Sequence, residues 1–304
     1  MKKIPVILDT DIGGDIDDTW ALGMLLKSPE LDVKLVTTAT GDTVYRAKIV
    51  AKFLESAGRS DIPIGIGIRQ NSDGPRERQA KWVENYDLKN YPGKVYEDGV
   101  SAILNTIESI GDTVSLICIG PLPNIAEAIR KKPDFSEKVN FVGMHGSFRL
   151  HHKTNLNLSP EKGPIPEWNV VQDIASAKTV FSSKWKSFTI TPLDTCGWVV
   201  LDGELYQKCK NSNDKIMKMI IENYMIWSRG VNNTDPQTHS SVLFDTVAVF
   251  LAFSTKWLKM KKMQISVDDK GFTIEDKSGI PANVAMEWLG LEEYKKWLVE
   301  RLLS

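Results

Sequence analysis

Short apolar runs alternate along the chain with longer stretches whose apolar residues have helical spacing. The strand-like runs are Ile4–Leu8, Val33–Thr38, Ile62–Ile68, Val114–Ile119, Val139–Met144 and Ser187–Thr191. The helix-like stretches are Trp20–Leu26, Val44–Ala57, Val100–Ile110, Ile125–Arg130, Ile174–Phe181, 204–229 and Val242–Phe253. Strands that alternate with helices predict βαβ units and a mostly parallel sheet with helices on its faces.

The chain end has a different pattern. Met263–Val267 and Gly271–Glu275 predict a closing hairpin, and Met286–Leu303 predicts a final helix. Because no internal repeat or linker interrupts the pattern, we predict one α/β domain over residues 1–304, with an open sheet flanked by helices. The long polar and aromatic segment 69–97 has two interpretations, a lid over a site or a surface excursion with its own short helix.

Composition narrows the class of protein. The 304 residues are 42% hydrophobic and 25% charged, which is typical of a folded globular chain. A net charge of −1 gives no broad electrostatic field for nucleic acid or a membrane surface, and no apolar run reaches the roughly 20 residues of a membrane span. Three cysteines without metal-ligand spacing predict free thiols. With the first strand at Ile4 leaving no room for a signal peptide, we expect a cytoplasmic protein, and secretion of a trimmed precursor is the alternative.

The largest group of acidic residues follows the first predicted strand. Five carboxylates stand within ten residues around Gly13 and Gly14, namely Asp9, Asp11, Asp15, Asp17 and Asp18. Open α/β sheets bind ligands at this end of their strands, and carboxylates so close repel one another unless a cation compensates. Oxygen ligands favour Ca²⁺ or Mg²⁺ over zinc. The alternative is a solvated acidic loop that caps the next helix; an EF-hand does not fit, because Trp20 stands where Glu is needed.

Later segments add polar groups near the ends of predicted strands and at the start of a helix. They are Asp42, Ile119-Gly120-Pro121, Glu167, Asn169 and Asp245. Gathered at one edge, they suit a metal-assisted hydrolase, in which a cation lowers the pKa of water and a nearby carboxylate accepts the proton. Asn and Glu side chains can also bind the hydroxyls of a sugar. Trp168, between Glu167 and Asn169, is expected to pack in the core.

Four segments in this order resemble the nucleoside hydrolase family, of the inosine-uridine-preferring type. They are Asp9-Thr10-Asp11 with Asp17-Asp18, Gly120-Pro121-Leu122-Pro123-Asn124-Ile125-Ala126, Glu167-Trp168-Asn169, and Asp245-Thr246-Val247-Ala248. The resemblance implies the family's Rossmann-like fold and Ca²⁺-dependent hydrolysis of the N-glycosidic bond of ribonucleosides to ribose and free base. It also implies a homodimer or homotetramer.

Carried over by position, the resemblance implies a role for each residue. Asp11 would be the general base and a Ca²⁺ ligand. The other Ca²⁺ ligands would be Asp18, Asp245 and the backbone carbonyl of Ile119. The nucleoside would be bound by Asp17, Asp42, Met144, Glu167 and Asn169, of which Asp42 stands where the family usually has Asn.

The chain departs from the family pattern in three places. The opening loop is two residues longer, so Asp15 is an extra acid, and no clear match to a ribose-binding Asn occurs around Asn155–Glu161. Phe244 replaces the His that precedes the late Asp in many members. We therefore predict His239 as the acid that protonates the leaving base, because an imidazole is the side chain suited to delivering a proton near neutral pH. The alternative is stacking of Trp82 or Phe244 on the base.

Two other functions stay open at this point. In a haloacid-dehalogenase-type phosphohydrolase, Asp9 would be the nucleophile and Asp11 the acid/base, but the Lys and second acidic pair of that class have no confident match. A binding protein that holds a nucleoside or ribose without turnover is the third possibility, since the His before Asp245 is missing.

Overall fold

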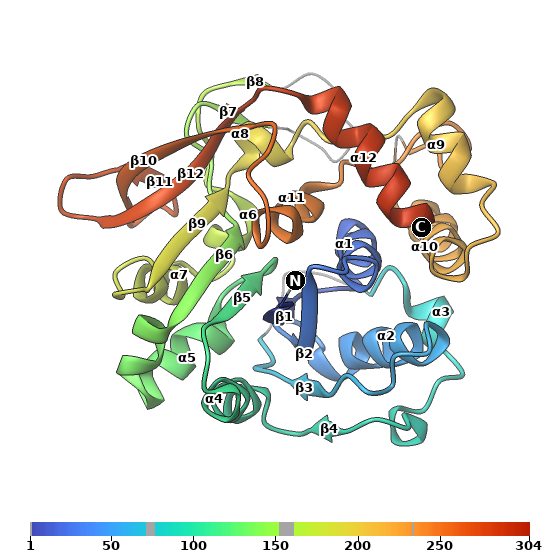
Figure 1. The fold of residues 1–304 in the computed structure, drawn as a ribbon, viewed down its shortest axis with the longest axis horizontal. Helices are drawn as coiled ribbons and strands as arrows, with labels where there is room; N and C mark the ends of the chain where they lie inside the picture. The colour runs from blue at the N-terminus through green and yellow to red at the C-terminus, as the bar shows by residue number, and fades with distance from the viewer. Residues whose placement is uncertain (1, 71–76, 152–160, 233) are drawn as a thin grey trace.

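A ten-stranded sheet forms the centre of the protein in the computed structural model, which describes residues 2–70, 77–151, 161–232 and 234–304 (Figure 1). The strand order is β11-β10-β12-β9-β6-β5-β1-β2-β3-β4, and all neighbouring pairs from β12 to β4 are parallel. Strand β10 is antiparallel to both of its neighbours. The expected open, mostly parallel α/β sheet is confirmed.

The described elements have the following bounds. The sheet strands are β1 Ile4–Thr10, β2 Leu31–Thr38, β3 Ile64–Ile66, β4 Val95–Tyr96, β5 Val114–Cys118, β6 Val139–Met144, β9 Ser187–Thr191, β10 Leu258–Val267, β11 Thr273–Glu275 and β12 Ile280–Trp288. A separate small pair is β7 Leu150–His151 with β8 Glu161–Lys162. The helices are α1 Asp17–Leu26, α2 Thr43–Ser56, α3 Ala80–Val83, α4 Gly99–Ile110, α5 Pro123–Lys131, α6 Trp168–Val171, α7 Ile174–Val180, α8 Leu193–Cys196, α9 Gly203–Lys210, α10 Lys215–Trp227, α11 Phe244–Leu251 and α12 Leu291–Leu303.

Helices cover both faces of the sheet because its inner strands are apolar on both sides. In β1, Val6 and Leu8 belong to one buried cluster, together with apolar residues of α1, α2, α10, α11 and α12. Ile7, between them, points to the other face and joins the cluster formed with α4, α5 and α7. Successive side chains of a strand point to opposite faces, so a strand buried on both sides needs an unbroken apolar run.

The chain reverses its direction of travel across the sheet at β1. From β1 it proceeds to β2, β3 and β4 on one side, whereas β5, β6, β9 and β12 follow on the other. Asp9 of β1 pairs with Cys118 of β5, and the Ile119 amide donates to the Asp9 carbonyl oxygen at 2.9 Å. The loops that leave β1 and β5 therefore lie side by side at the topological switch point, where open α/β sheets bind their ligands.

The C-terminal part of the chain differs from the prediction. Met286 and Trp288, expected in the last helix, end β12, which pairs with β9 on one side and β10 on the other. Two flanking strands override the helical spacing of this segment, since strand preference depends on packing against neighbours. The expected helix over 204–229 is two helices, α9 and α10, and Asp214 caps the second by accepting a hydrogen bond from Met217 N.

The segment 69–97 contains α3 and β4 in its described part, as the surface-excursion interpretation expects. Residues 71–76 lie outside the described residues, and so do 152–160, which include most of the region around Asn155–Glu161. The interpretation of 69–97 as a lid stays a prediction.

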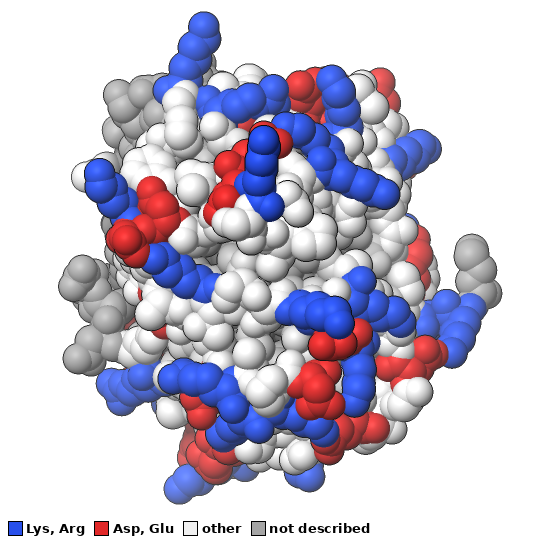
Figure 2. Space-filling view, turned by 90° about the vertical axis from the view of Figure 1, so that its left-hand side faces the viewer, with Lys and Arg blue, Asp and Glu red and all other residues white. Residues whose placement is uncertain are grey.

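The surface carries both signs of charge. Figure 2 shows the face on the left of Figure 1, where β10, β11 and β12 lie, and basic and acidic side chains are interspersed across it. Exposed ion pairs join these strands, such as Lys261–Glu275 and Lys259–Glu287, each at 3.0 Å. Within the described ranges, no helix is both long enough and apolar enough to span a lipid bilayer.

Candidate active site

The acidic loop leads from β1 into the first turn of α1. Asp17 and Asp18 begin this helix and are 6% and 3% exposed. Thr10, the last residue of β1, donates its hydroxyl hydrogen to Asp18 and accepts the Ile12 amide at 3.1 Å. Carboxylates in the first turn of a helix are stabilised by its dipole, so α1 lowers the cost of burying these two acids.

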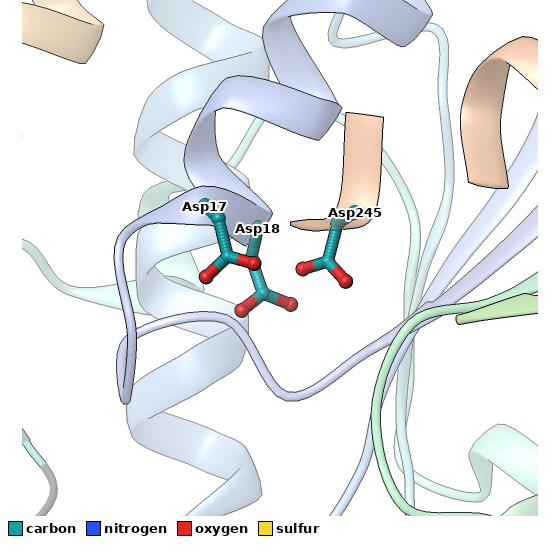
Figure 3. Close-up of side chains that lie close together, drawn as sticks. All are labelled: Asp17, Asp18 and Asp245. Atoms are coloured by element: carbon teal, nitrogen blue, oxygen red, sulfur yellow. The ribbon is translucent and has the colours of Figure 1, made fainter. Parts of the chain in front are cut away.

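A second helix brings the third carboxylate. Asp245 lies in the first turn of α11, which packs against α1, and it is 3% exposed. One carboxylate oxygen from each of Asp17, Asp18 and Asp245 lies within 4.8 Å of the other two, and Figure 3 shows the three groups close together where the two helices begin. We call these three residues the carboxylate cluster.

Burial and mutual repulsion shift the titration of the cluster. Burial, followed by the charge of Asp15, raises the pKa of Asp17 to about 8. The pKa values of Asp18 and Asp245 are also raised well above the ordinary range, first by burial and then by the neighbouring carboxylates. Three buried acids at this spacing are stable only if they share protons or a cation. Oxygen-only donors at such distances fit a hard divalent cation such as Ca²⁺, which takes several carboxylate oxygens.

Asp11 lies beside this cluster and against the β5 loop. Its charge raises the pKa values of Asp17, Asp18 and Asp245. A Cβ added at Gly120 would lie 2.7 Å from Asp11 Oδ1 and 2.9 Å from its backbone nitrogen. Glycine at 120 is therefore what allows the Asp11 side chain to reach the edge of β5. The cluster itself contains Asp17, which was expected to bind ribose; the Ca²⁺-ligand role of Asp11 stays a prediction.

The predicted sugar-binding residues form a second group beside Asp11. Glu167 caps α6 and is 2% exposed; its Oε1 accepts Asn169 N at 2.8 Å and its Oε2 accepts Gly146 N at 3.1 Å. Asn169 Nδ2 donates to the carbonyl oxygens of Met144 and Ile119 at 3.1 and 3.4 Å. Burial, with a smaller contribution from the charge of Asp11, raises the pKa of Glu167 to about 7. The structure thus brings Ile119, Met144, Glu167 and Asn169 together; their contacts with a nucleoside stay a prediction.

Asp42 and Asp15 have local partners. Asp42 caps α2 by accepting Val44 N at 3.0 Å and Tyr45 N at 2.9 Å, and Arg69 lies 3.7 Å from its other oxygen. Asp15, the extra acid of the longer loop, forms a 2.8 Å ion pair with Arg78. The capping role alone accounts for an Asp at position 42, with no need for a ligand. The contact of Asp42 with ribose stays a prediction.

His239 and Phe244 lie on the segment that leads into α11. His239 is half-buried; its Nδ1 lies 2.8 Å from the Ser240 carbonyl oxygen, and its own carbonyl accepts the Tyr224 hydroxyl at 3.0 Å. Phe244 is half-buried and is the first residue of α11, next to Asp245. The leaving-group roles of both residues stay predictions.

Two tryptophans lie in unexpected places. Trp82 is 4% exposed; its ring packs edge-on against Phe53, and the ammonium group of Lys52 lies 4.5 Å from its centre. This packing accounts for its burial, and base stacking by Trp82 stays a prediction. Trp168, expected in the core, is 39% exposed, so that expectation is wrong. It directly follows the helix cap Glu167, and the first turn of α6 buries its neighbours Asn169 and Val170 instead.

Thr10 and Asn124 have supporting roles that were not predicted from the sequence. Asn124 donates to Asp9 Oδ1 at 2.8 Å and to the Thr38 carbonyl at 3.0 Å, and it accepts Ile68 N at 2.7 Å. It therefore joins the ends of β1, β2 and β3; its place in a Gly-Pro motif was the available signal. Asp9 is completely buried, and burial raises its pKa to about 7. A buried, hydrogen-bonded Asp9 argues against the alternative in which it attacks a phosphate ester.

The family follows from comparison with known proteins. The family model described as inosine-uridine preferring nucleoside hydrolase matches residues 6–291, which is nearly the whole chain. The chain belongs to this family. Membership confirms the resemblance seen in the four motifs and the expected enzyme class, a hydrolase of the N-glycosidic bond of nucleosides.

Individual relatives are similar over different lengths of this nucleoside hydrolase. It is 32% identical to the probable uridine nucleosidase 2 of Arabidopsis thaliana over 192 residues, which is 60% of this chain and 56% of that protein. It is 25% identical to the non-specific ribonucleoside hydrolase RihC of Salmonella paratyphi A over 314 residues, 98% of this chain and 97% of that protein.

Solved structures have the same fold. The purine-preferring ribonucleoside hydrolase from Gardnerella vaginalis aligns with a TM-score of 0.80 at 21% identity and covers 98% of both chains. The plant nucleoside hydrolase PpNRh1 aligns with a TM-score of 0.80 at 22% identity over 100% of both chains. These alignments confirm the predicted nucleoside hydrolase fold.

The raised pKa of Asp17 predicts a pH-dependent stability. Between its ordinary value of 3.8 and about 8, folded Asp17 keeps a proton that the unfolded chain has released. In the presence of a chelator, the free energy of unfolding of the protein should therefore fall as pH rises through this interval. Chemical denaturation at several pH values measures the slope of the free energy of unfolding against pH. Asp17→Asn should reduce this slope, and Asp269→Asn, an exposed control, should leave it unchanged. A wild-type stability that stays constant over this interval would contradict the assignment.

The contact between Gly120 and Asp11 predicts a sharp steric effect. Gly120→Ala should leave the chain folded but displace Asp11, and a shift of about 1 Å at a catalytic group can reduce turnover about 10²-fold. Gly230→Ala is the matched control, because a Cβ there meets no atom within 4 Å. Ribose release and the thermal midpoint should be measured for both. Equal activities of the two variants would show that Asp11 does not depend on Gly120.

Proposed function

We propose that the protein is a Ca²⁺-dependent ribonucleoside hydrolase that releases ribose and a free base. The observation that carries the proposal is the convergence of three buried carboxylates within 4.8 Å beside Asp11, at the sheet edge that also holds Glu167 and Asn169. One part of the site is anionic and suits a hard cation, and the other part offers hydrogen-bonding groups for a sugar.

The residues that would hold the cation are Asp11, Asp18, Asp245 and the carbonyl of Ile119, with Asp17 next to them. When bound, Ca²⁺ would neutralise the repelling acids and lower the pKa of a water molecule in the site. Asp17 would then be ionised and free to accept hydrogen bonds from ribose hydroxyls. Its place within the cluster also suits it for a direct contact with the ion.

Asp11 would take the proton of the attacking water. Its place between the cluster and Gly120 puts a carboxylate at the junction of the two parts of the site. The bond from ribose to the base breaks with positive charge developing on the sugar, and fixed carboxylates stabilise that charge. A general base of this kind typically contributes about 10²–10⁴-fold to the rate.

Glu167 and Asn169 would position the sugar. Each oxygen of Glu167 already accepts one backbone amide and retains a lone pair for a hydroxyl group. These amides and the Met144 carbonyl fix both side chains before a substrate arrives, so little ordering is needed on binding. The names of relatives cover uridine, purine and non-specific ribonucleoside hydrolases. We therefore propose ribonucleosides as the substrate class, and a comparison of substrates determines which base is preferred.

A reducing-sugar assay on inosine, guanosine, adenosine, uridine and cytidine tests the proposal. It is run with chelator and with added Ca²⁺, beside a phosphate-release assay on a generic phosphomonoester. We expect ribose release that requires the cation. Phosphate release alone would support a phosphohydrolase, and neither product would support a binding protein without turnover.

Asp11→Asn tests the general base. The change keeps the size of the side chain but removes the proton acceptor, so turnover should fall about 10²–10⁴-fold while the fold is retained. Asp15→Asn is the control from the same loop, since Asp15 pairs with Arg78 and should affect turnover far less. Circular dichroism and Ca²⁺ calorimetry check that both variants fold and bind the ion. Wild-type turnover in Ca²⁺-loaded Asp11→Asn would remove Asp11 from this role.

His239→Ala tests the protonation of the leaving base. If His239 donates a proton, the variant should hydrolyse ordinary nucleosides more slowly, by about 10²-fold or more. Hydrolysis of p-nitrophenyl riboside should be spared, because nitrophenolate leaves without protonation. Equal losses on both substrates would indicate an effect on binding or folding, and unchanged rates on both would show that His239 is not the acid.

A further inference from the structure

The longer opening loop folds onto the first turns of α2. The Tyr45 hydroxyl donates to the Gly13 carbonyl oxygen at 3.1 Å, and Arg46 Nη1 donates to the Ile12 carbonyl oxygen at 2.8 Å. Gly13 has a φ of +103°, and a Cβ there would lie 2.7 Å from Ile49 Cδ1. Two consecutive residues of one helix thus hold two consecutive carbonyls of this loop.

Arg46 is a buried cation at the acidic site. The residue is 3% exposed, and its Nε donates to the Thr40 carbonyl oxygen at 2.9 Å. Its Nη2 lies 4.0 Å from Asp11 Oδ2. Burial and the neighbouring acids raise the pKa of Asp18, and the charge of Arg46 offsets a smaller part of that rise, so its field reaches the carboxylate cluster as well as Asp11. A buried charge is costly unless opposite charge lies nearby, and here the acids supply it.

The other arginines near the loop are in a different environment. Arg78 pairs with Asp15 at 2.8 Å, but the two side chains are 34% and 38% exposed. Arg69 lies 3.7 Å from Asp42, and its side chain is 71% exposed. Water and salt screen such exposed pairs. Arg46 is only 3% exposed, so water and salt screen its charge less than they screen these exposed pairs.

We propose that Arg46 is a built-in countercharge of the carboxylate cluster, which stabilises the acids before a cation binds and opposes the binding of a divalent cation. The inference rests on the proposed function, because it takes the cluster to be the cation site. Arg46 is a positioning residue through Ile12 and Thr40. Its charge adds a second effect, which reduces the repulsion between the acids and at the same time lowers their attraction for Ca²⁺.

Removal of Arg46 should change the affinity for Ca²⁺ in opposite directions under the two explanations of its role. If Arg46 only held the loop, removing it would disorder the acids and weaken Ca²⁺ binding. If its charge opposes the cation, removal should tighten binding, by about tenfold for unit charges a few ångströms apart in a partly buried site. By linkage, the same change should destabilise the ion-free protein more than the Ca²⁺-saturated protein.

The experiment compares Arg46→Gln and Arg46→Lys with the control Arg78→Gln in the full chain. Gln removes the charge but keeps an N–H donor for a loop carbonyl. Lys keeps the charge but lacks the planar guanidinium group with its several N–H donors. Titration calorimetry with CaCl₂ gives the dissociation constants, and thermal unfolding with chelator and with saturating Ca²⁺ gives the stabilities. We expect Arg46→Gln to bind about tenfold more tightly, and Arg46→Lys and Arg78→Gln to stay within about threefold of wild type.

Each outcome decides the proposal. Unchanged or weaker Ca²⁺ binding in Arg46→Gln, while the wild type binds Ca²⁺ and releases ribose, would overturn the countercharge and leave the proposed function intact. If Arg46→Gln folds only with Ca²⁺, the proposal is supported. If it does not fold at all, Arg46→Lys decides, because a tenfold loss of affinity in that charge-retaining variant would overturn the proposal. A wild type that neither binds Ca²⁺ nor releases ribose would refute the proposed function and this inference together.

Discussion

Repulsion between buried carboxylates is the constraint on which this site depends. Asp17, Asp18 and Asp245 lie within 4.8 Å of one another and are nearly inaccessible to water. Left ionised, they would oppose folding, and their raised pKa values express that cost. The fold compensates through two helix N-termini, the Thr10 hydroxyl and the guanidinium of Arg46. We propose that the residual repulsion favours the binding of a cation there.

The second part of the site is built on a different physical basis. Glu167 and Asn169 are held by backbone amides and carbonyls at the ends of β5 and β6 and the start of α6. Hydrogen bonds from a rigid backbone fix these side chains without a ligand, which suits groups that must select one arrangement of sugar hydroxyls. Asp11 lies where the two parts meet, and Gly120 leaves the space for it. The proposed cation site and the proposed sugar site can therefore be impaired separately.

Much of this arrangement could be predicted because parallel sheets place the ends of their strands along one edge. The strands β1, β2, β5, β6 and β9 lie where the apolar runs indicated, and the loops that follow β1, β2 and β5 carry Asp11, Asp42 and Gly120 as expected. The errors occurred where tertiary contacts override local pattern. Met286 and Trp288 have helical spacing with the residues that follow, yet they end β12, which pairs with β10 as far as Trp288. Trp168 looks like a core residue, but a helix cap places it at the surface.

The sequence by itself determined the class of fold, the edge of the sheet that carries chemistry, and the family, because apolar periodicity and the order of motifs are local properties. Only the tertiary structure decided that Asp17 joins Asp18 and Asp245 in one cluster. Asp17 and Asp245 come from opposite ends of the chain and converge because α1 packs on α11. No motif marked Arg46 either, since its importance lies in where α2 places a buried charge relative to the loop. Electrostatic energy depends on distance and burial, and both are properties of the folded chain.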